Sequence, residues 1–241
     1  AGASNYFAPT YVGAGNVVLS DTYTLPQVRV TSGSLAHNEA LSVGTLTHSG
    51  GTISGSEDLT VSGSAAWTGS TIQSGSGTTI IASGATATMN GTVILQGGRD
   101  FTNNGTLNQS GATYFRSAGD SDSTVTNTSG ANWNANLSNG TYIAYAEGGA
   151  STLSFINAGT LTKSGTGTNY IGHSSGTTTM TNTGTIAVAE GDISLQGGAL
   201  TFGGSGALRL TTDGSTKPLV TSGTLSFDGT LEVILASGYS P

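Results

Sequence analysis

The feature that most constrains this chain is internal repetition with a period of little more than twenty residues. Two consecutive stretches, residues 46–66 and 67–87, align with each other. The aligned apolar positions are Leu46 with Trp67, Leu59 with Ile80 and, after a two-residue slip, Ile53 with Ile72. Each stretch holds three short apolar segments separated by Gly/Ser turns. This arrangement predicts a coil of three strands that repeats along a solenoid.

A second signature appears in four copies further along the chain. The copies are FTNNGTL (residues 101–107), VTNTSG (125–130), FINAGTL (155–161) and MTNTGTI (180–186). The apolar residues at either end are expected to point inward on two strands. Asn and Gly tolerate the left-handed backbone of the sharp bend between those strands. If successive bends superpose, one amide from each copy can hydrogen-bond to the next as a ladder. These residues are Asn103, Asn127, Asn157 and Asn182.

Composition supports strands over helices. Charged residues make up 8% of the 241 residues and glycine numbers 39, while hydrophobic residues still reach 35%. The chain is rich in Thr, Val and Ile, which favour pleated surfaces, and glycine recurs too often for helix interiors. We therefore predict an all-β fold: a single-stranded right-handed parallel β-helix (β-solenoid) of about ten coils, each of roughly 21–25 residues.

Two regions depart from the repeat. Residues 1–40 contain several aromatic residues and two prolines, which predicts an irregular N-terminal coil or cap. The β-helix is expected to occupy residues 41–241. Within it, residues 112–150 are richer in aromatic and acidic residues, so we expect a decorated face or an inserted loop there.

Charge and residue usage exclude several classes of function. The net charge is −7 and Lys and Arg together number six, too few for a patch that follows a phosphate backbone, so nucleic-acid binding is not expected. There is no cysteine. No apolar run approaches the length of a transmembrane helix. The three histidines, His37, His48 and His173, lack metal-ligand spacing, so no metal or other cofactor is expected.

Acidic pairs raise the question of catalysis, because paired carboxylates hydrolyse glycosidic bonds. The pairs are Asp120 with Asp122 and Glu57 with Asp58. The Gly-His-Gly and Arg-x-Lys strings of pectin-cleaving β-helices do not occur in this chain. We therefore interpret the acids as solvated turn residues and predict that the protein is not an enzyme. A polysaccharide-degrading activity is the weakest of the alternatives.

Aromatic and threonine residues suggest binding instead. Trp133 lies among polar residues, and Tyr142 and Tyr145 follow soon after, so these three are the candidate ligand-binding residues for a glycan. Trp67 is expected in the core because it aligns with Leu46. Alternating threonines such as 177, 179, 181 and 183 are typical of ice-binding faces, but these motifs are scattered along the sequence. Glycan or ice binding is the alternative to a structural role.

The runs GTLTHSGGTISGSEDLTVSGSA and FINAGTLTKSGTGT resemble the repeats of large bacterial surface proteins, namely autotransporter passengers and filamentous-haemagglutinin-like adhesins. The resemblance covers residues 41–241. It implies a secreted, elongated β-helix that serves adhesion or the building of a surface layer, and it transfers no catalytic residue. We expect an extracellular or cell-surface segment of a larger protein. Its expected partners are further copies of itself, joined end to end as fibres, neighbouring surface proteins, or a glycan.

Overall fold

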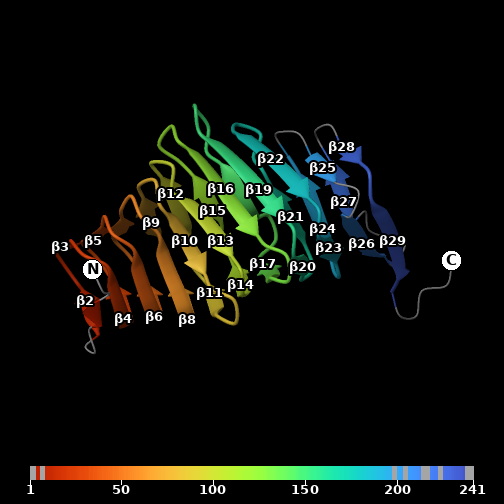
Figure 1. Cartoon of the computed structure of the whole chain (residues 1–241). Coiled ribbons are helices and arrows are strands. Elements are labelled where there is room, and N and C mark those ends of the chain that lie inside the picture. Colours follow the sequence, from red (N-terminus) through yellow and green to blue (C-terminus); the bar gives the residue numbers. More distant parts are fainter. Residues whose placement is uncertain are drawn as a thin grey trace.

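The computed structural model shows an elongated stack of coils with the two chain ends at opposite ends of the stack (Figure 1). It describes residues 4–5, 9–196, 200–202, 206–212, 218–221 and 225–236. Within these ranges the chain forms strands and turns but no helix, and every strand pairing is parallel. The prediction of an all-β parallel β-solenoid is confirmed. The stack has about nine turns, against the ten expected.

Each coil contributes strands to three columns that run along the stack. The first column contains β1 (Ser4–Asn5), β4 (Tyr23–Val30), β6 (Leu41–His48), β8 (Leu59–Trp67), β10 (Thr78–Ile81), β13 (Asp100–Asn103), β16 (Asp122–Asn127), β19 (Thr152–Asn157), β22 (Thr177–Asn182), β25 (Leu200–Phe202) and β28 (Leu225–Phe227). The second contains β2 (Thr10–Val12), the C-terminal halves of β4, β6 and β8, β11 (Thr86–Met89), β14 (Thr106–Gly111), β17 (Asn132–Leu137), β20 (Thr160–Ser164), β23 (Thr185–Val188), β26 (Ala207–Thr212) and β29 (Thr230–Leu235).

The third column forms a separate 10-stranded sheet. It contains β3 (Asn16–Leu19), β5 (Ser34–His37), β7 (Thr52–Ser54), β9 (Thr71–Ser74), β12 (Val93–Gln96), β15 (Phe115–Ser117), β18 (Tyr142–Ala146), β21 (Thr168–Ile171), β24 (Asp192–Leu195) and β27 (Leu219–Thr221). The first two columns make one 19-stranded sheet because β4, β6 and β8 each span both.

The register of the early coils corrects the 21-residue alignment. Leu59 pairs with Thr79, so Ile80 lies one position along and points outward. Trp67 lies over His48 instead of Leu46, and Ile53 pairs with Gln73 instead of Ile72. Because side chains alternate between the two faces of a strand, a shift of one residue would have exposed every core residue of the coil.

Coil length is therefore less uniform than predicted. Tyr23 pairs with Leu41 and Leu41 with Leu59, which gives coils of only 18 residues near the N-terminus. Val125 pairs with Phe155, which gives a coil of 30 residues inside the region expected to carry an insertion. The extra residues lie in turns, because the strands that pair between these coils stay in register.

The N-terminal region is more regular than expected. Residues 1–3 and 6–8 lie outside the described part of the chain. From Thr10 onward, β2 pairs with β4 and β3 pairs with β5 in continuous register. Val12, Leu25 and Leu35 are buried in the same core as the later coils. The stretch therefore folds as ordinary coils, because its apolar residues alternate as strand residues do.

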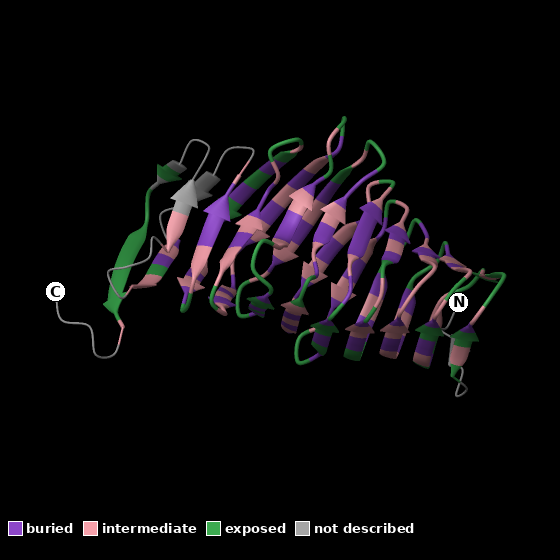
Figure 2. Ribbon diagram, turned by 180° about the vertical axis from the view of Figure 1, so that it is seen from behind, coloured by how far each residue is buried: buried purple, intermediate pink, exposed green. Residues whose placement is uncertain are grey.

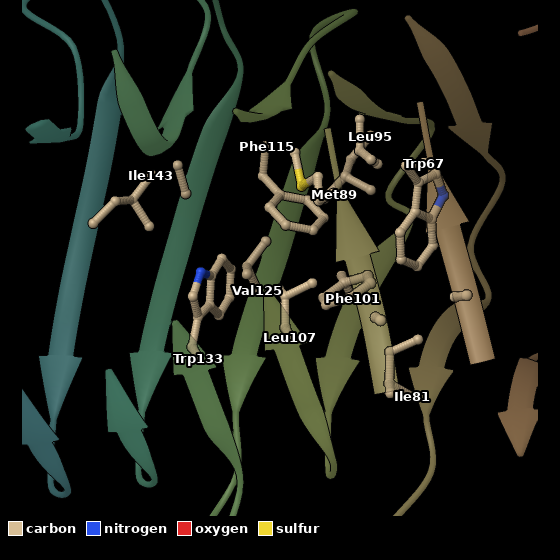
Figure 3. Packing of buried hydrophobic residues seen from close by; sticks show 14 of the residues in the cluster. Trp67, Ile81, Met89, Leu95, Phe101, Leu107, Phe115, Val125, Trp133 and Ile143 are labelled. Atoms are coloured by element: carbon tan, nitrogen blue, oxygen red, sulfur yellow. The ribbon is translucent and has the colours of Figure 1, made fainter. Parts of the chain in front are cut away.

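Apolar side chains from all three columns fill the interior (Figure 3). At its centre is a chain of buried aromatic rings with centroids 4.6–5.8 Å apart: Trp67, Phe101, Phe115, Trp133 and Phe155. Trp67 is fully buried, which confirms its expected place in the core. At some of the bends, close stacking leaves no room for a side chain. A Cβ on Gly51, which has φ +76°, would lie 2.4 Å from the carbonyl oxygen of Gly33 in the coil before it.

Candidate functional site

An aromatic strip on the outer face of the third column is the candidate functional site. It comprises Tyr114, Tyr142, Tyr145, Tyr170 and His173, which come from three successive coils around β15, β18 and β21. We call these five residues the tyrosine strip. Each is partly exposed. The sequence interpretation included Tyr142 and Tyr145 and missed the other three as members of one site.

A β-bulge in β18 explains how Tyr142 and Tyr145 share a face. In a regular strand, residues three apart point to opposite faces. Here Ile143 and Ala144 are both buried, and the register with β21 shifts between Tyr142 and Ala144. The extra residue turns both tyrosines outward, as bulges commonly re-aim side chains. Alternation alone could not have predicted this.

The rings of the strip touch in an unbroken series. The centroid of Tyr145 lies 5.3 Å from that of Tyr114 and 4.7 Å from that of Tyr142. Tyr142 in turn lies 5.2 Å from Tyr170. His173 lies 5.4 Å from Tyr142 and 5.6 Å from Tyr145. These distances are those of favourable aromatic pairs, so the rings cover part of one another's faces and hold the coils together.

Burial raises the pKa of two phenols of the strip. Burial, with a contribution from Tyr114, raises the pKa of Tyr145 to about 12, although the neighbouring Arg116 acts in the opposite direction. Burial also raises the pKa of Tyr142. Arg116 forms an ion pair with Glu147 at 3.0 Å. The strip therefore offers ring edges and neutral hydroxyls, beside a balanced pair of charges.

Trp133 does not belong to the site. The sequence suggested an exposed ligand-binding residue, but Trp133 is fully buried, and its Nε1 donates to Oε1 of Gln109 at 2.9 Å. The polar neighbours Asn132 and Asn134 are exposed because they alternate with it along β17. That strict alternation was the signal that Trp133 points inward.

The four signature asparagines form a hydrogen-bonded column inside the solenoid. Nδ2 of Asn103 donates to Oδ1 of Asn127 at 2.8 Å, and Asn127 donates to Asn157 at 2.8 Å. Asn157 donates to Asn182 at 2.6 Å. Each of the first three also donates to a backbone carbonyl of the next coil, and all four are fully buried. Burial leaves these amides no access to a ligand, so their role is structural.

Asp58, Asp120 and Asp122 accept hydrogen bonds from the next coil. Oδ1 of Asp120 accepts from the backbone N–H of Ala150 at 3.2 Å, and Oδ1 of Asp122 accepts from the Thr152 hydroxyl at 2.6 Å. Oδ1 of Asp58 accepts from the backbone N–H of Thr78 at 2.9 Å. Within the described ranges, no three His, Asp or Glu side chains lie together as a metal site would require. No helix there is long and apolar enough to cross a membrane.

Outward hydroxyl and amide groups are more ordered than the sequence suggested. One register position of the second column carries, coil after coil, Thr45, Ser64, Thr86, Thr106, Asn132, Thr160 and Thr185. The position two residues on is irregular, with Ala66 and Ala187 among its members. The alternating threonines themselves are scattered, as the sequence indicated, because Thr86 and Thr88 lie in β11 of the second column whereas Thr177, Thr179 and Thr181 lie in β22 of the first.

Two buried cations were not anticipated from the sequence. Arg99 donates to the carbonyl oxygens of Gly55, Glu57 and Thr78 at 3.2–3.3 Å, and burial lowers its pKa to about 10. Lys163 donates to the carbonyl oxygens of Gly165 and Glu190, and burial lowers its pKa as well. Both cations satisfy carbonyl groups at coil corners.

No family model, no curated protein and no solved structure matches the chain. The fold is that of a β-solenoid, and the likeness to adhesin repeats is carried by the sequence motifs alone.

Proposed function

We propose that this chain is a rod-like structural or adhesive segment of a larger extracellular surface protein, which stacks end to end with further solenoid coils. The observation that carries the proposal is the state of the last coil. Strand β29 is exposed along its whole length, as Figure 2 shows at the C-terminal end of the stack. Resemblance to bacterial surface repeats supports the extracellular location.

The exposed strand carries residues that are core residues elsewhere in the solenoid. Leu231 pairs with Leu208, which is 3% exposed, yet Leu231 itself is 56% exposed. Val233 and Leu235 follow on the same face and are 57% and 49% exposed. At the first two of these positions the earlier coils place buried residues, Leu208 and Val188, whereas Leu235 pairs with the partly buried Thr212. An uncovered apolar strand edge is a template for another strand.

A second copy of the chain would extend the stack. Both ends of the solenoid belong to the same parallel columns, so a head-to-tail contact keeps the strand direction in each column. Such a contact is heterologous and does not close on itself, so it yields filaments.

Electron microscopy and sedimentation of the purified chain test this proposal. We expect concentration-dependent filaments or head-to-tail oligomers, and we expect Val233→Lys to abolish them by placing a charge on the apolar edge. Ser226→Lys is the matched control, because Ser226 is exposed on β28 beside the end but pairs outward with Thr201. A wild-type chain that stays monomeric at high concentration, or equal assembly of both variants, would contradict the proposal.

Glycan binding through the tyrosine strip is the second candidate function. Partly exposed aromatic rings with hydroxyl groups at their edges suit contacts with sugars, which combine apolar faces and hydroxyl groups. Binding to immobilised polysaccharides should fall when Tyr170 is replaced by alanine. It should persist in Tyr11→Ala, because Tyr11 is 60% exposed and lies far along the chain from the strip. Equal binding by the two variants would remove this candidate.

A further inference from the structure

We propose that the tyrosine strip is a site of oxidative cross-linking, at which Tyr142 couples covalently to an adjacent tyrosine ring of the same chain. This inference goes beyond the rod function and does not depend on end-to-end stacking or on glycan binding. It requires tyrosine rings in contact with each other, a surface location that an oxidant can reach, and a fold that holds the rings in place.

Tyr142 meets these requirements, as does its neighbour Tyr145, and it alone joins the rings of its own coil to Tyr170 of the next. Two other phenol rings lie against it, with centroids at 4.7 Å for Tyr145 and 5.2 Å for Tyr170. The plane of the Tyr170 ring is tilted by 38° from that of Tyr142. Tyr142 is also partly exposed, at the middle of the strip.

The contact series lets two oxidised rings meet. A tyrosyl radical formed at Tyr114 can take an electron from Tyr145, which lies 5.3 Å away, and Tyr145 can do the same to Tyr142. Oxidation at any tyrosine of the strip can therefore pass along the ring contacts to Tyr142.

The chemistry balances with a peroxide oxidant. Each of two phenols loses one electron and one proton and becomes a tyrosyl radical. The radicals join through a new carbon–carbon bond between their ortho carbons, and the two ortho hydrogens move to the oxygens and restore both phenols. The two electrons and two protons reduce one hydrogen peroxide, activated by a haem peroxidase, to two waters. The chain itself loses two hydrogens.

A bond between Tyr142 and Tyr170 would join β18 to β21 in the next coil. It would close the loop between these residues and so restrict the unfolded chain, as disulfides do. The chain has no cysteine with which to achieve this.

The test treats dilute, purified full-length chain with hydrogen peroxide and a haem peroxidase, then isolates the monomer. We expect an intact mass lower by two hydrogens, dityrosine fluorescence, and a cross-linked peptide containing Tyr142. Tyr142→Phe keeps the ring stack but lacks the hydroxyl, so the cross-linked peptide that contains residue 142 should be lost from the monomer. Tyr11→Phe, a change in an exposed tyrosine outside the strip, should leave it unchanged.

The wild-type chain unfolded in denaturant is the second control, because the strip no longer exists there. The Tyr142 cross-link should then disappear from the monomer. Dityrosine found only between chains, or a cross-link in the wild-type monomer that does not include Tyr142, would overturn the proposal.

Discussion

At the scale of single residues, the interior polar groups show how stacking replaces the usual core. The Asn column continues a line of inward positions that is apolar in earlier coils, where Val43, Val61 and Ile81 stand in turn. Ile81 pairs directly with Asn103. An amide is tolerated there only because the next coil supplies its partner. Each asparagine thus depends on the coil that follows it.

We expect Asn157→Ala to lower the free energy of unfolding by about 2–4 kcal/mol, because it leaves buried partners of its amide unpaired. Asn157 accepts from Asn127 and donates to Asn182. Asn134→Ala is the matched control: Asn134 is exposed and hydrogen-bonds to Asn108, so its loss should cost less than about 1 kcal/mol. Urea unfolding monitored by circular dichroism measures both. Equal losses would show that the column is not stabilising.

Two buried histidines predict a dependence of stability on pH. The pKa of both His37 and His48 is lowered to about 4, chiefly by burial. At His37 the charge of Arg99 contributes to the lowering, and Asp58 opposes it. The unfolded chain binds protons at these sites from about pH 6.5, before the folded chain does, so stability is complete above that pH and falls towards pH 4. Between pH 7 and pH 5 each histidine should cost roughly 2 kcal/mol.

The measurement is chemical denaturation at both pH values, with a double variant His37→Leu, His48→Leu as control. The double variant should lose less stability on acidification than the natural chain. A natural chain with the same unfolding free energy at pH 7 and pH 5 would contradict the expected effect.

At the scale of strands and coils, short bend motifs predicted the register better than long alignments did. The Asn-x-Gly copies paired as their spacing indicated, with Phe101 on Val125 and Val125 on Phe155. The bend fixes the register because its asparagine must reach the next asparagine. The 21-residue alignment was one or two residues too long because the coils there are shorter than 21 residues: Leu46 pairs with Ala65 and Leu59 with Thr79.

The candidate site was also only partly predictable. Clustering of aromatic residues in the sequence pointed to Tyr142 and Tyr145, but their common face depends on the bulge at Ile143. Tyr170 joins the strip through the register of β21 with β18, across a coil of unusual length. Trp133 was misplaced because its polar neighbours were taken as a sign of exposure, whereas they alternate with it.

Removing the buried charge of Arg99 from its coil corner should strongly destabilise the fold. Arg99→Met should lower the free energy of unfolding by about 2–4 kcal/mol, because the carbonyl groups of Gly55, Glu57 and Thr78 lose their donor. Arg116→Met removes a surface ion pair and should cost less than about 1 kcal/mol. Hydrogen exchange should quicken locally in the Arg99 variant, around β7 and β10. Two variants of equal stability would contradict this account of the corners.

At the scale of the whole molecule, the solenoid is a one-dimensional stack in which each coil contacts its neighbours. Among the described residues, the core positions of the middle coils are buried between neighbouring coils, whereas Leu231 and Val233 of β29 are exposed. In such an architecture stability is close to a sum over neighbouring coils, so terminal coils are the least stable and the most apt to take a partner. The contact between neighbouring coils that makes the solenoid long is thus also the contact through which we expect chains to assemble.

The most direct test of the stacked, in-register solenoid is a pair of distances along its axis. Spin labels attached to Ser42→Cys and Thr126→Cys lie four coils apart in one outward column, and labels on Ser42→Cys and Thr181→Cys lie six coils apart. With about 4.8 Å between strands, pulsed electron paramagnetic resonance should give separations of about 19 Å and about 29 Å. Distances that do not grow with the number of coils would contradict the stack.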